Sequence, residues 1–144
     1  MMVHPRDRAG LEILPFAECL RLLETVPVGR VGFVSDGEVV ILPVNHLADG
    51  QTVVFRSNSG SKLSTVGSKT LVGFEVDDYD KPTHSGWSVV VSGFTEVVED
   101  EGEIRRLEHL GLESWGGAGA DASWIRIRPT SVSGRRTSGA AFAD

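Results

Sequence analysis

The strongest constraint on the fold of this chain is a series of short apolar runs separated by hairpin-turn signals. Asp36-Gly37 and Asp49-Gly50 each lie between two apolar runs of strand length, and Asp-Gly is among the dipeptides that tight hairpin turns prefer. Strands joined by such turns are antiparallel. We therefore predict successive antiparallel strands at residues 30–35, 38–47 and 51–57.

The rest of the chain continues this pattern. Further apolar runs predict strands at residues 69–76, 87–98 and 124–127, and the polar, proline-containing segment 77–86 is predicted to be a long turn. Strands of this spacing that are connected by hairpins favour an antiparallel barrel over a parallel sheet. The sequence thus predicts a mainly β fold with short helices.

Some residues interrupt the predicted strands. Pro43 suggests a bulge or a stretch where the ladder is broken, because proline cannot donate to a ladder. Gly93 suggests a bulge or bend, and Pro129 is expected to interrupt the last strand.

Helical spacing is confined to short segments. Apolar residues from Phe16 to Leu23 recur at helical spacing. Pro15 suits the first turn of that helix and Pro27 should end it. A short helix is expected at residues 63–67 and a further helix at about 102–112. We expect one domain at residues 13–136, with a flexible arm at 1–12 and a flexible tail at 137–144.

Composition excludes several classes of protein. The net charge of −6 argues against nucleic-acid binding. The single cysteine, Cys19, can form neither an intrachain disulfide nor a thiolate zinc site. Asp77, Asp78 and Asp80 lack a calcium-loop pattern, so we expect no metal site. The first residues contain no apolar run, so we expect no signal peptide, and no run reaches membrane length. These observations favour a cytoplasmic protein with no membrane partner.

One segment could carry chemistry. The acidic chain has no Asp or Glu between Asp49 and Glu75, and Arg56 and Lys62 lie in this gap among several serines. Arginine can give bidentate hydrogen bonds to a phosphate, and lysine adds a point charge. The segment is a candidate phosphate cradle, and the alternative is a solvated Gly/Ser turn.

An ordered set of short motifs resembles the pyridoxamine 5'-phosphate oxidase-like flavin-binding family. The resemblance covers about residues 14 to 136. The motifs, in chain order, are Glu18-Cys19-Leu20-Arg21-Leu22-Leu23, Val28-Gly29-Arg30-Val31, Leu42-Pro43-Val44-Asn45-His46, Val53-Val54-Phe55-Arg56-Ser57, Gly60-Ser61-Lys62-Leu63, Phe74-Glu75-Val76-Asp77, Gly86-Trp87-Ser88-Val89-Val90-Val91-Ser92-Gly93, Trp124-Ile125-Arg126-Ile127-Arg128-Pro129 and Gly134-Arg135-Arg136.

The resemblance implies a six-stranded split barrel that forms a homodimer, with FMN, or alternatively a deazaflavin cofactor, in the groove between two barrels. It also implies roles for single residues. Pro43, Val44 and Asn45 would run along the isoalloxazine edge. Arg56, Ser57, Ser61 and Lys62 would hold the phosphate, and Trp87 and Ser88 would line the ring or its ribityl chain. Trp124 and the arginines near the C-terminus would close the site from the partner chain.

The implied activity is that of an oxidoreductase acting on a small molecule. The extended basic substrate site of the oxidase itself is not matched here, so we do not expect vitamin B6 oxidation. Alternatives are a non-catalytic flavin- or haem-binding sensor on the same scaffold and a reductase of the nitroimidazole type. Trp87 and Trp124 could instead anchor the barrel or the dimer. His46 and His84 have no partner carboxylate in the sequence, so no catalytic residue is assigned.

Overall fold

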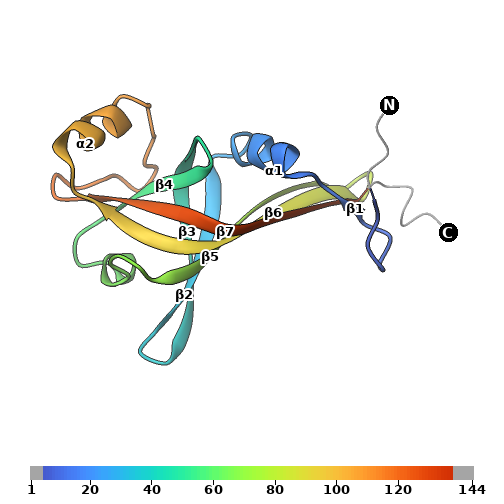
Figure 1. Ribbon diagram of the computed structural model, residues 1–144, viewed down its shortest axis with the longest axis horizontal. Helices are drawn as coiled ribbons and strands as arrows, with labels where there is room; N and C mark the ends of the chain where they lie inside the picture. Colours follow the sequence, from blue (N-terminus) through green and yellow to red (C-terminus); the bar gives the residue numbers. More distant parts are fainter. Residues whose placement is uncertain (1–4, 138–144) are drawn as a thin grey trace.

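The computed structural model describes residues 5–137 of the chain, which form two helices of eight residues, a 3-10 turn and a strongly twisted sheet (Figure 1). The helices within this range all fall short of the length and hydrophobicity that crossing a membrane requires. The elements, in chain order, are β1 (Glu12–Ile13), α1 (Phe16–Leu23), β2 (Val28–Ser35), β3 (Glu38–Asp49), β4 (Thr52–Ser57), η1 (Lys62–Thr65), β5 (Leu71–Asp80), β6 (Ser85–Val98), α2 (Glu101–Glu108) and β7 (Ser123–Thr137).

The sheet closes into a barrel. Its strand order is β1-β7-β4-β3-β2-β5-β6, and β6 also pairs with β7, so that six strands form a ring and β1 is an extra short strand on β7. Every pairing is antiparallel. The predicted six-stranded antiparallel barrel is therefore confirmed.

The two ends of the chain are described only in part. Within the predicted N-terminal arm, Arg6 forms an isolated bridge with Glu12, and the Asp7 carboxylate accepts a hydrogen bond from Arg135 at 3.2 Å. Residues 1–4 of that arm and residues 138–144 of the predicted tail lie outside the described residues.

The predicted long turn at residues 77–86 is wrong. β5 continues to Asp80 and β6 starts at Ser85, with Asp80 opposite Ser85 in register. Only residues 81–84 make the turn, where His84 adopts a φ of 53°. This end of the hairpin projects beyond the barrel (Figure 1), and its residues 78–84 are exposed. Paired strands that are exposed to solvent can consist of polar residues, so the polarity of this segment did not distinguish a hairpin from a long turn.

Pro129 does not interrupt the last strand as predicted, because a bulge accommodates it. β7 is continuous from Ser123 to Thr137. Pro129 lies opposite Gly93, and the register shifts between Ser92 and Gly93, which confirms the bulge predicted there. A Cβ atom on Gly93 would collide with the Arg128 carbonyl oxygen. The extra residue of the bulge breaks the ladder at the position where proline lacks an N–H.

The barrel is split beside β3. β4 pairs with β3 only from His46 to Asp49, whereas β2 pairs with β3 from Glu38 to Asn45. On the β4 side, the first part of β3 therefore has no ladder partner among the described strands. Pro43 lies in this stretch, where its missing N–H costs no hydrogen bond to β4. The bulge that we considered at Pro43 is absent, because the pairing of β3 with β2 continues through this residue without a register shift.

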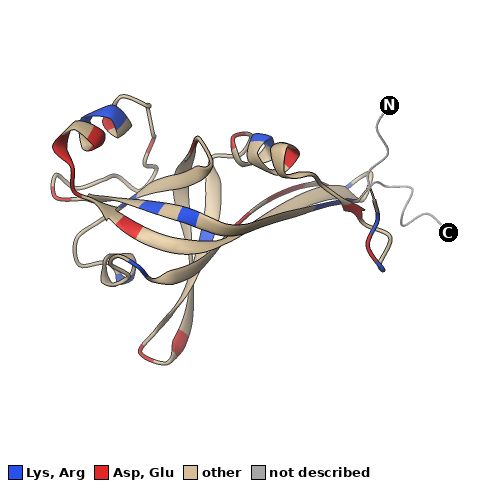
Figure 2. Ribbon diagram, in the orientation of Figure 1, with Lys and Arg blue, Asp and Glu red and all other residues tan. Residues whose placement is uncertain are grey.

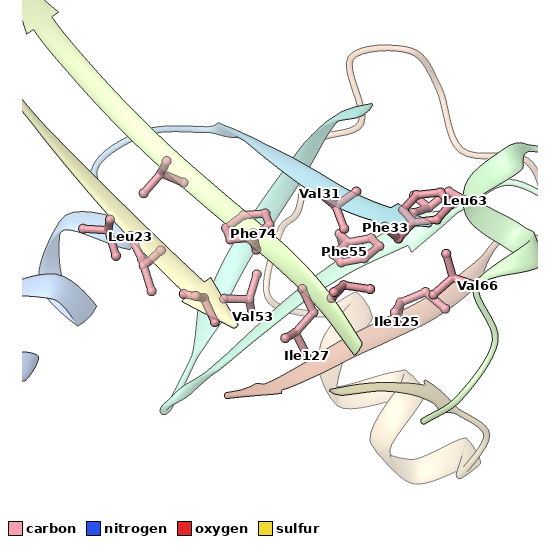
Figure 3. Close-up of a cluster of buried hydrophobic side chains, with 14 of the residues drawn as sticks. Leu23, Val31, Phe33, Val53, Phe55, Leu63, Val66, Phe74, Ile125 and Ile127 are labelled. Carbon is pink, nitrogen blue, oxygen red and sulfur yellow. The ribbon is translucent and has the colours of Figure 1, made fainter. Parts of the chain in front are cut away.

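The interior of the barrel is filled by its own side chains. Phe55 and Phe74 are fully buried, and β-branched residues from all six barrel strands surround them (Figure 3). Leu63 and Val66, in and just after η1, cover one end of this core, while Leu22 and Leu23 of α1 pack against it from another side. A small barrel packed in this way has no room for a ligand inside, so any binding site lies outside.

α2 is attached to the barrel by an ion network as well as by apolar contacts. Leu107 packs with Val54, Val98 and Trp124. Arg126, which is 6% exposed, donates to the Asp49 and Glu103 carboxylates at 2.8 and 2.7 Å. Arg106 of α2 also binds Asp49, at 2.6 Å. Figure 2 shows the charged residues of α2 and the basic residues along β7.

The Asp49 carboxylate generates a prediction about acid stability. Hydrogen bonds from Arg106 and Arg126 lower the pKa of Asp49 from 3.8 to about 2. Because the folded-state pKa is depressed, the stabilisation is present above about pH 4 and is lost as the pH falls toward 2. We expect Asp49→Asn to lower the free energy of unfolding at pH 7 by about 2 kcal/mol, measured by urea denaturation.

The difference between wild type and Asp49→Asn should vanish near pH 2. Glu99→Gln, at an exposed position, is the control and should leave the pH profile unchanged. Identical pH profiles for wild type and Asp49→Asn would contradict the prediction.

Candidate functional site

A hollow lies on the outside of the barrel where β3 and β4 separate. It has a volume of about 250 Å³. We call it the Arg56 hollow. The unpaired side of β3, the segment after β4 and the connection between α2 and β7 form its walls. Predicted site residues that line it are Pro43, Val44, Asn45, Arg56 and Ser61.

Arg56 is the charged group of this hollow. Its side chain lies over the Trp124 ring, 5.5 Å from the ring centroid, and its Nη2 donates to the Ala122 carbonyl at a long 3.4 Å. Within residues 5–137 its buried Nε has no hydrogen-bond partner. A guanidinium has five N–H donors, so most of the binding capacity of Arg56 is unused and an anion would fit it.

The wall opposite β3 is held in place by two asparagine side chains. Asn58 donates to the Gly117 carbonyl at 3.2 Å and accepts from the Gly119 N–H at 2.9 Å. Asn45 accepts from the Trp115 N–H at 2.9 Å. These hydrogen bonds anchor a glycine-rich connection whose residues are mostly exposed.

The remaining residues of the predicted phosphate group have different surroundings. Ser61 caps η1, since its hydroxyl accepts from the Ser64 N–H at 3.2 Å and donates to the Asn58 carbonyl at 2.7 Å. Lys62 is exposed, with Nζ 4.0 Å from Glu38. Ser57 is 2% exposed and faces the barrel interior with Phe55, on the side of β4 opposite to Arg56.

Trp87 and Ser88 lie elsewhere. They border a separate hollow of about 250 Å³ together with Arg135 and Arg136. This hollow is lined by residues at the start of β6 and the end of β7; Figure 1 shows this end of β6 beside β1, far from α2. Within one chain, Trp87 and Ser88 are therefore separated from the predicted phosphate-binding residues, whereas Pro43, Val44 and Asn45 lie beside Arg56.

Trp124 packs within its own chain. It is 3% exposed and belongs to the apolar cluster beneath α2. Of the two roles considered for it, the structure shows an anchor of the barrel, with one ring face beneath Arg56.

The two histidines differ in environment. His46 lies in the barrel interior with its ring edge against Phe74, and its Nε2 is 2.8 Å from the Leu23 carbonyl. A carbonyl only accepts, so Nε2 carries a proton, and burial lowers the pKa of this imidazole. His46 is therefore a neutral residue that ties α1 to β3, whereas His84 is exposed in the β5–β6 turn.

The sequence did not single out Asn58 or the connection between α2 and β7. Asn58 lies inside the serine-rich segment, and its polar side chain beside Arg56 was the available signal. Ser114, Gly116 and Gly117 also line the hollow, but they are more than fifty residues away in sequence, and no local pattern places them there.

A second hollow lies on the other side of the hydrogen bond between Asn45 and Trp115. Its volume is about 670 Å³, and we call it the Trp115 hollow. Leu47 and Leu112 contribute to an apolar lining, and Glu24 and Glu113 add carboxylates.

A group of charges lies on the outer face of the barrel. Arg30 Nη1 is 3.9 Å from Glu75 and 3.5 Å from Asp77. Burial, followed by the neighbouring Asp77 carboxyl, raises the pKa of Glu75 to about 7 despite the opposing charge of Arg30. This face therefore has charges of both signs and one carboxyl that takes up a proton near neutral pH.

Comparison with known proteins agrees with the sequence motifs. The family profile described as pyridoxamine 5'-phosphate oxidase matches residues 16–136. The uncharacterised protein Rv0080 of Mycobacterium tuberculosis is 35% identical over 124 residues, which cover 83% of this chain and 80% of that protein. The chain belongs to the pyridoxamine 5'-phosphate oxidase family.

Solved structures show the same fold. The FAD binding protein from Mycobacterium smegmatis superposes with a TM-score of 0.76 at 35% identity, covering 87% of this chain and 98% of that one. A conserved protein of unknown function, DIP1874 from Corynebacterium diphtheriae, has a TM-score of 0.73 at 32% identity, with 87% and 96% covered.

Proposed function

We propose that this protein binds a flavin nucleotide whose phosphate lies on Arg56. The observation that supports this most directly is the unused hydrogen-bonding capacity of Arg56, whose buried Nε has no partner within residues 5–137. The guanidinium lines the hollow and makes one long hydrogen bond, to the Ala122 carbonyl, so a phosphate there would add charge-assisted hydrogen bonds to its remaining N–H groups.

Neighbouring residues assist Arg56 to different degrees. Lys62 is exposed and only loosely paired with Glu38, so its ammonium can turn toward a bound phosphate. The Ser61 hydroxyl already donates to the Asn58 carbonyl and retains acceptor capacity only. Arg56 therefore provides most of the phosphate affinity, with Lys62 as a second charge.

The cofactor extends beyond the phosphate in some relatives. The relative from Mycobacterium smegmatis is named for FAD, whereas our sequence-based expectation is FMN with a deazaflavin as the alternative. All of these share a phosphate next to the ribityl chain, so the Arg56 hollow serves each of them. We therefore propose a flavin, either FMN or FAD, and make the comparison of the cofactors part of the test.

We also propose that the protein is a homodimer formed through the outer face of β2, β3, β5 and β6. Gly32 and Gly73 are opposite each other in register and leave the backbone uncovered. Exposed apolar residues flank them, among them Ile41 at 67% exposure. Arg30 and Glu75 place a positive and a negative group on this face. In a two-fold interface the same face meets itself, so groups of opposite charge can pair across it.

This dimer would bring Ser88 of one chain close to the Arg56 hollow of the other chain. Pro43 and Ser88 both lie on the outer face, on strands at opposite sides of the patch. A two-fold axis through the patch brings one chain's Ser88 toward the other chain's Arg56 hollow. The groove between two barrels is then the place for the flat ring, because each barrel interior is filled.

The proposed activity is oxidation or reduction of a small organic molecule. A bound flavin supplies the hydride or electron transfer, and the protein supplies binding, orientation and access. This division agrees with the buried, neutral position of His46, which leaves it a structural rather than a proton-transferring role.

The phosphate proposal is tested by titrating apoprotein with riboflavin, FMN, FAD and a deazaflavin cofactor, using flavin fluorescence or calorimetry. We expect Arg56→Ala to weaken FMN binding by about 10- to 100-fold, the equivalent of one strong charge-assisted hydrogen bond. Riboflavin, which has no phosphate, should bind wild type and variant equally. Arg128→Ala, an exposed arginine paired with Glu96, is the matched control. Equal losses for riboflavin and FMN would contradict the role of Arg56.

Redox activity is tested with the flavin-loaded protein under anaerobic conditions. We expect a nicotinamide donor or a reduced deazaflavin to remove the yellow absorbance of the bound flavin, and an electron acceptor to restore it. A bound flavin that none of these donors reduces would favour a binding protein without turnover.

The dimer is tested by sedimentation or light scattering at micromolar concentrations. We expect wild type at twice the chain mass of 15.5 kDa and Ile41→Glu at the monomer mass, because a charge in the patch would be desolvated without a partner. Leu110→Glu places the same charge at an exposed apolar position after α2 and should remain dimeric. A monomeric wild type would overturn the interface.

A further inference from the structure

The Trp115 hollow is large enough to bind part of a small molecule. Its volume of about 670 Å³ lies within the range of about 300–1,000 Å³ that is typical of small-molecule sites. Leu23, Val26, Leu47 and Leu112 contribute apolar side chains to its walls. The Trp115 indole, which is 66% exposed, also borders it.

This hollow adjoins the Arg56 hollow. Asn45 lines both hollows. Successive residues of the connection between α2 and β7 line one hollow or the other in alternation. Glu113 and Trp115 line the Trp115 hollow, while Ser114 and Gly116 line the Arg56 hollow. The hydrogen bond from the Trp115 N–H to the Asn45 side chain is the boundary. The two hollows are therefore neighbours on the surface, and a ligand that extends over the hydrogen bond between Asn45 and Trp115 would reach both of them.

The charges of the two hollows are opposite. Among the described residues that line the Trp115 hollow there is no Lys or Arg, whereas Glu24 and Glu113 line it. Carboxylates repel a phosphate, so the phosphates of a ligand belong on the Arg56 side. The Trp115 side suits an uncharged aromatic group, which can stack on an exposed indole.

We propose that the Trp115 hollow binds the adenine ring of a flavin adenine dinucleotide whose phosphates lie in the Arg56 hollow. This inference rests on the proposed function, because it requires the flavin phosphate on Arg56. It adds that the connection between α2 and β7 selects FAD over FMN. Trp115 provides a stacking surface, and the hydrogen bond from its backbone N–H to the Asn45 side-chain oxygen holds that backbone in position.

The experiment compares FMN and FAD binding to the full-length apoprotein of wild type and of Trp115→Ala by calorimetry. We expect wild type to bind FAD about tenfold more tightly than FMN, which corresponds to one stacked base. Trp115→Ala should abolish that difference by weakening FAD alone. Trp115→Phe keeps an aromatic ring and should retain most of the difference. Leu110→Ala removes an exposed apolar side chain near the start of the same connection and should retain all of it.

The outcomes separate this inference from the proposed function. Equal affinities of wild type for FMN and FAD, or an equal loss of both in Trp115→Ala, would overturn the adenine subsite while the flavin site on Arg56 stands. Binding of neither flavin would overturn both. Trp115 is exposed, so its variants should unfold at the same temperature as wild type, and a thermal scan verifies that a loss of FAD binding is local.

Discussion

The pairing of β7 with both β4 and β6 is the interaction on which the rest of the structure depends. β7 aligns with β4 from Ser123 to Ile127 and with β6 along almost its whole length. These two ladders close the ring, and without them β4 and β6 would be open edges that invite association with other chains. Closure also encloses the core around Phe55 and Phe74, which excludes a ligand from the interior and places the candidate site on the outside.

The candidate site exists because this closure is incomplete in one place. β3 and β4 share only a short ladder, and the space that opens between them is covered by the connection from α2 to β7 rather than by another strand. That connection is rich in glycine and relies on the side chains of Asn45 and Asn58 for its position. A wall held by a few hydrogen bonds can adjust to a ligand more readily than a packed strand can, which suits the cofactor site proposed there.

Charge is distributed so that one acidic chain can still attract an anionic cofactor. The net charge is −6, yet most of the arginines are committed to carboxylates, as Arg126 is to Asp49 and Glu103. Arg56 differs because it has an aromatic ring and a distant carbonyl as neighbours instead of a carboxylate. Since its charge is not neutralised locally, it remains available to an external anion, and this availability cannot be inferred from net charge.

The sequence by itself determined the features that depend on neighbouring residues: the Asp-Gly hairpins, the strands around them and the gap in acidic residues around Arg56. It failed where exposure or pairing with distant strands decided the outcome, as in the polar ladder at Asp77 to Asp80 and the uninterrupted β7 at Pro129. Only the tertiary structure placed Trp115 beside Asn45, seventy residues away, and separated Ser88 from Arg56 within one chain. The physical reason is that turn and strand preferences act between adjacent residues, whereas a hollow is formed by whichever distant segments the barrel closure brings together.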